Sequence, residues 1–150
     1  MSLLKYLTLD TVTASLAGAA KPEVIESLLD IIVRTGKVHD RAAALDALLT
    51  RERKLSTGME NGIAIPHGKT DTVSELVAAV GITPAPVDFD AQDRQPCRIF
   101  IMTLSPSHRT GPHIQFLAEI SDLLRSESLR ARLLTAKDGR EIIQALTDRL

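Results

Sequence analysis

The sequence predicts an α/β fold: a single domain in which a small mixed β-sheet is flanked by helices on both faces. Residues 76–82 and 99–104 are continuous apolar runs of strand length. Runs that are apolar on both faces favour strands in the middle of a sheet that is covered on both sides. Apolar residues at helical spacing precede and follow these runs, so helices and strands are interspersed. Because no linker, repeat or low-complexity segment divides residues 1–150, we expect one domain.

Two helices are predicted before the first strand. Lys21 and Pro22 open the first helix, because proline is favoured at the first helical position, and Gly36 closes it. Asp40 is a natural N-cap for the second helix, which ends near residues 51–53. The predicted buried stripe of that second helix consists of Ala44, Leu45, Leu48 and Leu49.

The remainder of the chain alternates loops, strands and helices. A polar loop at residues 54–61 leads into a short strand that ends at Pro66. Residues 87–90 alternate in polarity and predict a short edge strand, followed by a turn at residues 91–96. After a proline-containing loop at residues 105–112, helical spacing begins at His113. Two more short helices are predicted at residues 128–135 and 139–150.

Composition excludes several classes of protein. The formal net charge is −1 and aromatic residues make up only 3% of the chain, so neither a general attraction to nucleic acid nor a base-stacking platform is expected. The single cysteine, Cys97, excludes an intramolecular disulfide and a multi-cysteine zinc site, and we interpret it as a half-buried, inert thiol. The N-terminal residues are too short and interrupted for a signal peptide or a membrane span. We therefore expect a cytoplasmic protein without direct membrane insertion.

His67 is the strongest candidate for a reactive group. The apolar run at residues 62–66 ends at Pro66 and delivers His67 into a glycine-flanked loop, on a rigid base. An imidazole with an ordinary pKa of about 6.5 is partly neutral and nucleophilic at cellular pH. This placement favours a chemical role for the His67 side chain over a role in packing.

The other histidines differ in their settings. His39 precedes the Asp40 cap and His108 lies in a polar loop, so surface positions are expected for both. His113 follows Pro112 and is expected in the first turn of a helix, where the positive end of the helix dipole lowers the pKa of an imidazole and keeps it neutral. We expect His113 to be functional if the fold brings it next to His67.

Three further residues suit an anionic group. Ser56 and Thr57 are small donors in the loop before His67, and Arg51 carries a guanidinium at the end of the preceding helix. With two imidazoles, this set suits a transferable phosphoryl group, for which a protein mainly supplies positioning and charge stabilisation. The chain has no Gly-x-x-x-x-Gly-Lys-Ser/Thr loop, so the phosphoryl group is expected to come from another protein.

Two motifs resemble those of a known family. The first combines Arg51-Glu52 and Ser56-Thr57-Gly58 with residues 61–69, Asn-Gly-Ile-Ala-Ile-Pro-His-Gly-Lys, and the second is residues 113–118, His-Ile-Gln-Phe-Leu-Ala. Both resemble motifs of the enzyme IIA domains of the bacterial phosphoenolpyruvate-dependent phosphotransferase system, of the fructose/mannitol type that includes nitrogen-regulatory proteins. The likeness covers nearly the whole chain and implies a small mixed sheet between helices.

The resemblance implies a role for each matching residue. His67 would accept a phosphoryl group from the phosphocarrier HPr or a paralogue and pass it to a IIB component of a sugar transporter. His113 would be the supporting histidine, and Arg51 would neutralise phosphate charge. The alternative is a nitrogen-regulatory type of protein whose phosphorylation state controls its binding to transporters, kinases or other regulators. His108 is close enough to His113 in the sequence to compete for the supporting role.

A third alternative is a metal-dependent hydrolase in which His67, His108 and His113 ligate zinc. The spacing of these histidines matches no standard zinc motif, and no acidic residue stands out as a general base. We therefore expect neither a metal nor a cofactor.

Overall fold

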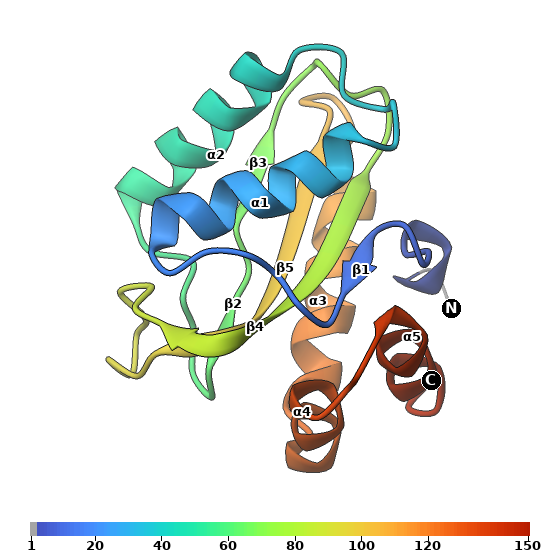
Figure 1. Ribbon diagram of the computed structural model, residues 1–150. Helices are drawn as coiled ribbons and strands as arrows, with labels where there is room; N and C mark the ends of the chain where they lie inside the picture. Colours follow the sequence, from blue (N-terminus) through green and yellow to red (C-terminus); the bar gives the residue numbers. More distant parts are fainter. Residues whose placement is uncertain (1–2) are drawn as a thin grey trace.

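A mixed five-stranded sheet forms the centre of the computed structural model, which describes residues 3–150 (Figure 1). The strands are β1 (Val12–Thr13), β2 (Ile63–Ala64), β3 (His67–Lys69), β4 (Val77–Val87) and β5 (Cys97–Ser105). Their order is β1-β4-β5-β2, and β3 also pairs with β5. β4 and β5 are antiparallel, whereas β1 is parallel to β4, and β2 and β3 are parallel to β5.

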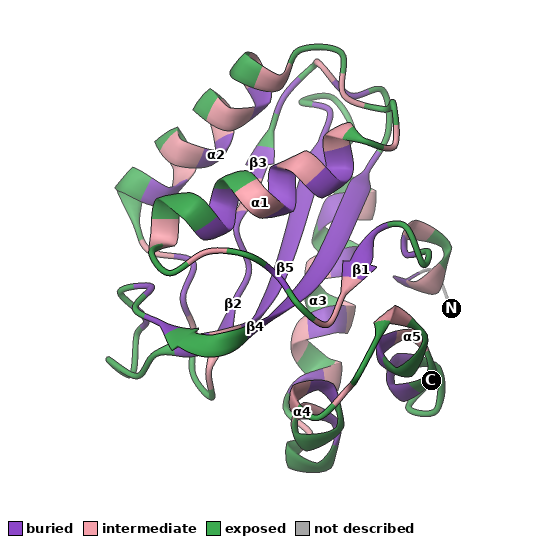
Figure 2. Cartoon of the chain, in the orientation of Figure 1, coloured by how far each residue is buried: buried purple, intermediate pink, exposed green. Residues whose placement is uncertain are grey.

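Helices cover both faces of this sheet, as predicted. On one face lie α1 (Lys21–Val33) and α2 (Arg41–Lys54); on the other lie the 3-10 helix η1 (Leu3–Tyr6), α3 (Thr110–Leu123), α4 (Glu127–Leu134) and α5 (Gly139–Thr147) (Figure 1). Figure 2 shows that β4 and β5 are buried along most of their length. The sequence-based fold class is therefore confirmed.

The two central strands divide their side chains between two cores. Val77 and Ala79 of β4 pack with α1 and α2, whereas Ala78 and Val80 pack with the C-terminal helices. Successive side chains of a strand point to opposite faces of a sheet, so a strand that is covered on both sides is apolar throughout. This is the reason that the pattern of residues 76–82 predicted a central strand.

The starts of the first two helices follow the predicted signals. Pro22 lies in the first turn of α1, and the carboxylate of Asp40 accepts a hydrogen bond from the backbone N–H of Ala43 at the start of α2. The buried stripe of α2 is narrower than predicted. Its fully buried members are Ala44, Leu48 and Glu52, whereas Leu45 and Leu49 are partly buried against the same core.

Several predicted boundaries are wrong. Residues 87–90 are not a separate edge strand, because β4 continues to Val87, which pairs with Cys97 after a shift in register that follows Ile82. The helix that carries His113 begins at Thr110, since proline is tolerated in a first turn where backbone N–H groups have no partner inside the helix. The last helix ends at Thr147 rather than residue 150, and α4 begins one residue earlier than predicted and ends at Leu134.

Cys97 is more deeply placed than expected. Its side chain is fully buried rather than half-buried, because it belongs to the core beneath α1 and α2. Burial raises the pKa of the Cys97 thiol to about 11, with the negative charges of Asp93 and Asp88 acting in the same direction. The reactive thiolate form is thus disfavoured. Among residues 3–150, no helix combines the length and apolar character needed to cross a bilayer.

Candidate functional site

His67 lies at the point where an edge of the sheet is interrupted and resumes. β2 ends at Ala64, Ile65 and Pro66 break the strand, and β3 begins at His67 itself. His67 is therefore in a strand and not in a loop as predicted. The strand can resume because Pro66, which has no N–H, still offers its carbonyl to the backbone N–H of Thr103 at 3.1 Å. His67 is aligned with Thr103 in the parallel pairing with β5.

The interruption also supplies a hydrogen-bond partner for the imidazole. Nδ1 of His67 lies 2.8 Å from the carbonyl oxygen of Ile65. A carbonyl can only accept, so Nδ1 carries the proton and donates it. In the neutral ring the other nitrogen, Nε2, is then unprotonated and holds a free lone pair. The backbone thus selects the tautomer in which Nε2 is free to act as a nucleophile.

His113 lies beside His67 although the two are far apart in the sequence. The ring centroids are 5.5 Å apart and the ring planes are inclined by 51°. His113 is the fourth residue of α3, and 5% of its surface is exposed. Its Nδ1 is buried and has no hydrogen-bond partner among residues 3–150. The fold therefore brings His113 next to His67, as the expectation of a functional His113 requires.

Both imidazoles are kept neutral at pH 7. Burial lowers the pKa of His67, and the charge of Arg51 also lowers it. The hydrogen bond to the Ile65 carbonyl acts in the opposite direction. The pKa of His113 is lowered to about 4, mainly by burial, with positive charge at His67 and Lys69 acting in the same direction. The helix dipole was the predicted cause of a lowered pKa at His113, whereas the largest cause in the structure is desolvation of the ring.

The histidine pair opens into a pocket of about 430 Å³ between α2, β3 and α3. Arg51, Lys54 and Lys69 line it, together with a single carboxylate from Asp46, so positive charge prevails around the imidazoles. Arg51 is partly engaged, because its Nη1 donates to the carbonyl of Leu55 at 2.6 Å, but a guanidinium has five N–H donors. As expected from the sequence, Arg51 lies at the end of α2 and near His67. Lys54 and Lys69 were missed as site residues.

The structure corrects the expected placement of Ser56 and Thr57. Neither lines the pocket of the histidine pair. The hydroxyl of Ser56 donates to the carbonyl of Phe89 at 2.7 Å, and the hydroxyl and backbone N–H of Thr57 donate to Glu52 at 2.6 and 2.8 Å. Both hydroxyls thus fix the loop that follows α2.

Glu52 holds this loop, although in the sequence it was only part of the first motif and no role was predicted for it. Its carboxylate is buried, forms an ion pair with Lys21 at 2.8 Å and accepts both hydrogen bonds from Thr57. The signal for its burial was present, because Ala44, Leu48 and Glu52 recur every four residues on one face of α2.

The remaining histidines lie elsewhere. His39 and His108 are both exposed, and neither lines the pocket of His67 and His113. His108 is therefore not placed to support His67. Within residues 3–150, no group of three or more histidine, cysteine or acidic side chains is arranged to hold a metal ion. The three histidines proposed for zinc are not brought together.

Residues 5–149 match the family described as the phosphoenolpyruvate-dependent sugar phosphotransferase system, EIIA 2. The chain belongs to this EIIA family. It is 42% identical to the fructose-specific EIIA component of the phosphotransferase system of Haloferax volcanii over 130 residues, which cover 87% of this chain and 84% of that protein.

Solved structures of EIIA proteins share the fold. The nitrogen regulatory protein IIA-Ntr from Neisseria meningitidis superposes with a TM-score of 0.88 at 28% identity, covering 95% of this chain and 97% of that one. Enzyme IIAMTL of Escherichia coli, solved in complex with phosphorylated enzyme IIBMTL, gives a TM-score of 0.80 at 25% identity, covering 95% of this chain and 97% of that one. This EIIA chain is thus similar both to sugar-specific and to nitrogen-regulatory proteins.

Proposed function

We propose that this EIIA chain is a phosphoryl carrier whose acceptor atom is Nε2 of His67. The observation that carries the proposal is the 2.8 Å hydrogen bond between His67 Nδ1 and the Ile65 carbonyl. It leaves Nε2 unprotonated in a pocket where Arg51, Lys54 and Lys69 supply positive charge. A nucleophile held neutral beside several cations suits an incoming phosphoryl group.

The reaction needs no proton transfer at His67. The Nε2 lone pair forms a bond to the phosphorus of a donor phosphohistidine while the donor N–P bond breaks. The donor nitrogen keeps the electron pair of the broken bond, and Nδ1 of His67 keeps its proton and its bond to Ile65. Because Nδ1 keeps its proton, the phosphorylated ring is an imidazolium cation that carries an anionic phosphoryl group. Passing the group on reverses these steps with a different partner.

His113 and Arg51 have supporting roles in this proposal. The neutral ring of His113 is close enough to hydrogen-bond a phosphoryl oxygen once the group is bound, since the ring centroids of the two histidines are 5.5 Å apart. Arg51 and the two lysines offset the phosphoryl charge. Ser56 and Thr57 act at a distance, by fixing the loop that follows Arg51.

The proposed partners are a phosphohistidine donor of the HPr type and a IIB component as acceptor. A IIB acceptor is supported by the related enzyme IIAMTL, which was solved in complex with phosphorylated enzyme IIBMTL. A second candidate role is regulatory and is supported by the similarity to the nitrogen regulatory protein IIA-Ntr. A phosphoryl group adds roughly −1.5 to −2 charges, which is enough to change how a docking surface binds another protein.

A phosphorylation assay tests the proposed acceptor. The purified protein is incubated with phosphoenolpyruvate, enzyme I and HPr, or with their nitrogen-branch counterparts, and its mass is measured. We expect an acid-labile gain of about 80 Da, one phosphoryl group, in the wild type and in His108→Ala, and no gain in His67→Ala. Equal phosphate uptake by His67→Ala would overturn the assignment of the acceptor.

Two further measurements separate the transport role from the regulatory one. Transfer of the phosphoryl group from the labelled protein to a purified IIB component supports transport. A pull-down that recovers different proteins with the phosphorylated and unphosphorylated forms supports regulation, and a pull-down indifferent to phosphorylation counts against it.

A further inference from the structure

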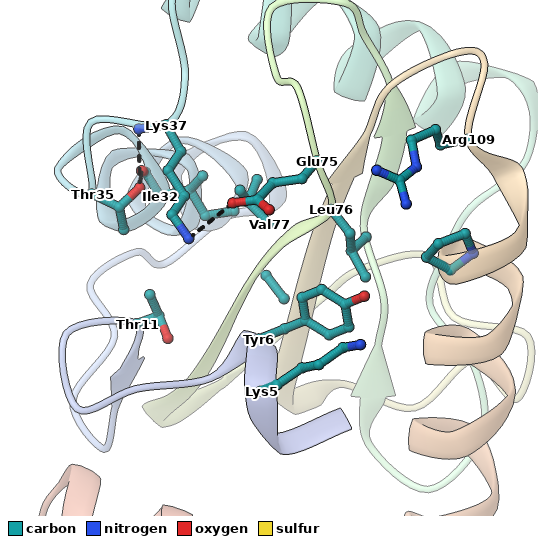
Figure 3. Close-up of a pocket in the computed structure, with 12 residues that line it drawn as sticks. Lys5, Tyr6, Thr11, Ile32, Thr35, Lys37, Glu75, Leu76, Val77 and Arg109 are labelled. Atoms are coloured by element: carbon teal, nitrogen blue, oxygen red, sulfur yellow. Dashed lines mark hydrogen bonds and ion pairs between the residues drawn. The ribbon is translucent and has the colours of Figure 1, made fainter. Parts of the chain in front are cut away.

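A second pocket lies across the first turn of α3 from the histidine pair. It has a volume of about 350 Å³ and is bordered by η1, β4 and the start of α3, with the Tyr6 ring in its middle (Figure 3). We call it the Tyr6 pocket. Pro112 lines the Tyr6 pocket, whereas His113, the next residue, lines the pocket of His67. One helical turn thus forms a wall of both cavities.

The inner wall of the Tyr6 pocket is apolar. Leu76, Val77 and Ala78 line it and are all buried in the cores of the protein. The Tyr6 ring adds an aromatic surface and packs edge-on against Phe116 of α3, with ring centroids 5.9 Å apart. A wall of this kind suits the short carbon chain of a small molecule.

The rim of the pocket carries an excess of positive charge. Lys37 is paired with Glu75 at 3.3 Å, and their charges offset one another. Lys5 and Arg109 form no ion pair among residues 3–150, and the Lys5 ammonium lies 5.2 Å from the centre of the Tyr6 ring. In Figure 3 the guanidinium of Arg109 extends from the start of α3 toward Leu76, and the Lys5 ammonium lies on the other side of Tyr6. Two cations without an ion-pair partner in the described part of the chain thus border a cavity whose inner wall is apolar.

We propose that the Tyr6 pocket binds a small organic dicarboxylate and that its occupancy changes the position of His113. The planar guanidinium of Arg109 matches one carboxylate through two parallel hydrogen bonds. The ammonium of Lys5 takes the second carboxylate, and the connecting methylene groups lie against Tyr6 and Leu76. An inorganic anion would satisfy the cations but leave the apolar wall without a contact.

Ligand binding in the Tyr6 pocket is coupled to the histidine pair through the helical turn that both pockets share. The effect of this coupling on phosphoryl transfer rests on the proposed function. A dicarboxylate contacts Arg109 at the N-cap of α3 and Pro112 in its first turn. Proline restricts the backbone there, so this turn moves as a unit. His113 continues the same turn, and its ring centroid is 5.5 Å from that of His67. The ligand therefore regulates how well His113 supports His67.

Binding is tested on the unphosphorylated protein, so the result does not depend on phosphoryl transfer. Glutarate is titrated and followed by calorimetry and by the NMR signals of the Tyr6 ring, with glutaramide as an uncharged analogue and inorganic phosphate as a third probe. We expect saturable binding of glutarate and shifts of the Tyr6 signals that neither of the other probes produces. Equal shifts with glutaramide or phosphate would contradict a dicarboxylate site.

In the same assay, two charge variants are expected to change the affinity for glutarate in opposite directions. Arg109→Gln weakens glutarate binding about ten-fold or more, because a bond to a charged group is lost. The fold is expected to persist, since the Arg109 side chain makes no capping bond at α3. Glu75→Gln tightens binding, because it releases the charge of Lys37. The control, Arg125→Gln, removes the same charge outside the pocket and leaves binding unchanged. Wild-type affinity in Arg109→Gln would exclude the site.

The coupling is measured separately from binding. Saturating glutarate is expected to shift the ring signals of His113 in the wild type but not in Arg109→Gln, and to change the rate of phosphoryl uptake. Tyr6 shifts without any change at His113 would refute the coupling while leaving the binding site in place. If the protein accepts no phosphoryl group, the proposed function fails, whereas the His113 shift still decides the coupling.

Discussion

At the scale of single residues, the site depends on how two imidazoles are kept neutral. His67 is half-buried and His113 is 5% exposed, and burial is the largest cause of the lowered pKa of each ring. Of the predicted site residues, His67, His113 and Arg51 meet in one pocket. Ser56 and Thr57 do not, because sequence proximity to His67 says nothing about the direction in which a hydroxyl points. Their bonds to Phe89 and Glu52 depend on long-range packing.

Replacing His113 should slow phosphoryl uptake without abolishing it. In His113→Ala the nucleophile is intact, but a neutral hydrogen-bonding group beside it is lost. We expect the rate of phosphorylation to fall on the order of 100-fold, the usual effect of removing one preorganised group next to developing charge. Quench-flow measurement of the acid-labile phosphate checks this. A rate equal to that of the wild type would remove His113 from the mechanism.

Arg51 and Arg53 provide a matched comparison on the same helix. Arg51 lines the pocket of the histidine pair, whereas Arg53 is exposed, bonds to Thr50 at 3.1 Å and does not line it. Arg51→Gln should slow phosphoryl uptake by roughly ten-fold or more, because a charge-assisted contact to the phosphoryl group is lost. Arg53→Gln should leave the rate unchanged. Equal effects of the two substitutions would indicate that only the net charge of the region matters.

At the scale of elements, the sequence predicted the central strands and the starts of α1, α2 and α5, but not the edge strands. β1 has only two residues, Val12 and Thr13, which are too few to show a pattern in the sequence, and it pairs with β4. The apolar run predicted a strand over residues 76–82, whereas β4 continues to Val87 through a register shift in which residues 84–86 are exposed. Pro66 indicated a strand end, whereas β3 resumes at His67.

The loop between α2 and β2 is packed so closely that adding one methyl group at Gly58 should lower the stability of the protein. The backbone N–H of Met59 donates to Ile63 at 2.8 Å, and a Cβ added at Gly58 would lie 2.8 Å from the Cα of Ala91. We expect Gly58→Ala to destabilise the protein by about 1–3 kcal/mol, because backbone must shift to admit the methyl group.

Gly111→Ala is the control for this substitution. A Cβ at Gly111 in α3 would meet nothing within 4 Å, so stability should be unchanged or slightly higher, as alanine favours helices. Urea unfolding of both variants measures the difference. A Gly58→Ala variant as stable as Gly111→Ala would show that the loop adapts without cost.

At the scale of the whole molecule, the histidine pair links stability to pH. The pKa of His113 is about 4 in the folded protein and about 6.5 in an unfolded chain. Between these values the unfolded state binds the extra proton, so stability is complete above about pH 6.5 and decreases as the pH falls toward about 4. The lowered pKa of His67 acts in the same direction.

The pH effect is measurable as a difference between variants. Each pKa unit corresponds to about 1.4 kcal/mol, so His113 alone lowers the free energy of unfolding on the order of 3 kcal/mol between pH 7 and pH 4. In His113→Phe this decrease should be smaller by that amount, as measured by chemical unfolding across the range. In Lys69→Gln it should be slightly smaller than in the wild type, because Lys69 helps to lower the pKa of His113. Parallel curves for His113→Phe and the wild type would contradict the linkage.

The partner of His67 Nδ1 is a main-chain carbonyl, that of Ile65, and not a side chain. Every amino acid has the same carbonyl, so no substitution at position 65 can delete this acceptor. Only a change that moves the backbone around Pro66 can do so. The tautomer proposed to react is therefore protected against most point mutations, whereas the side chains around the pocket can be exchanged without changing it. Evolution can alter the partners of such a protein by changing those side chains without changing which nitrogen reacts.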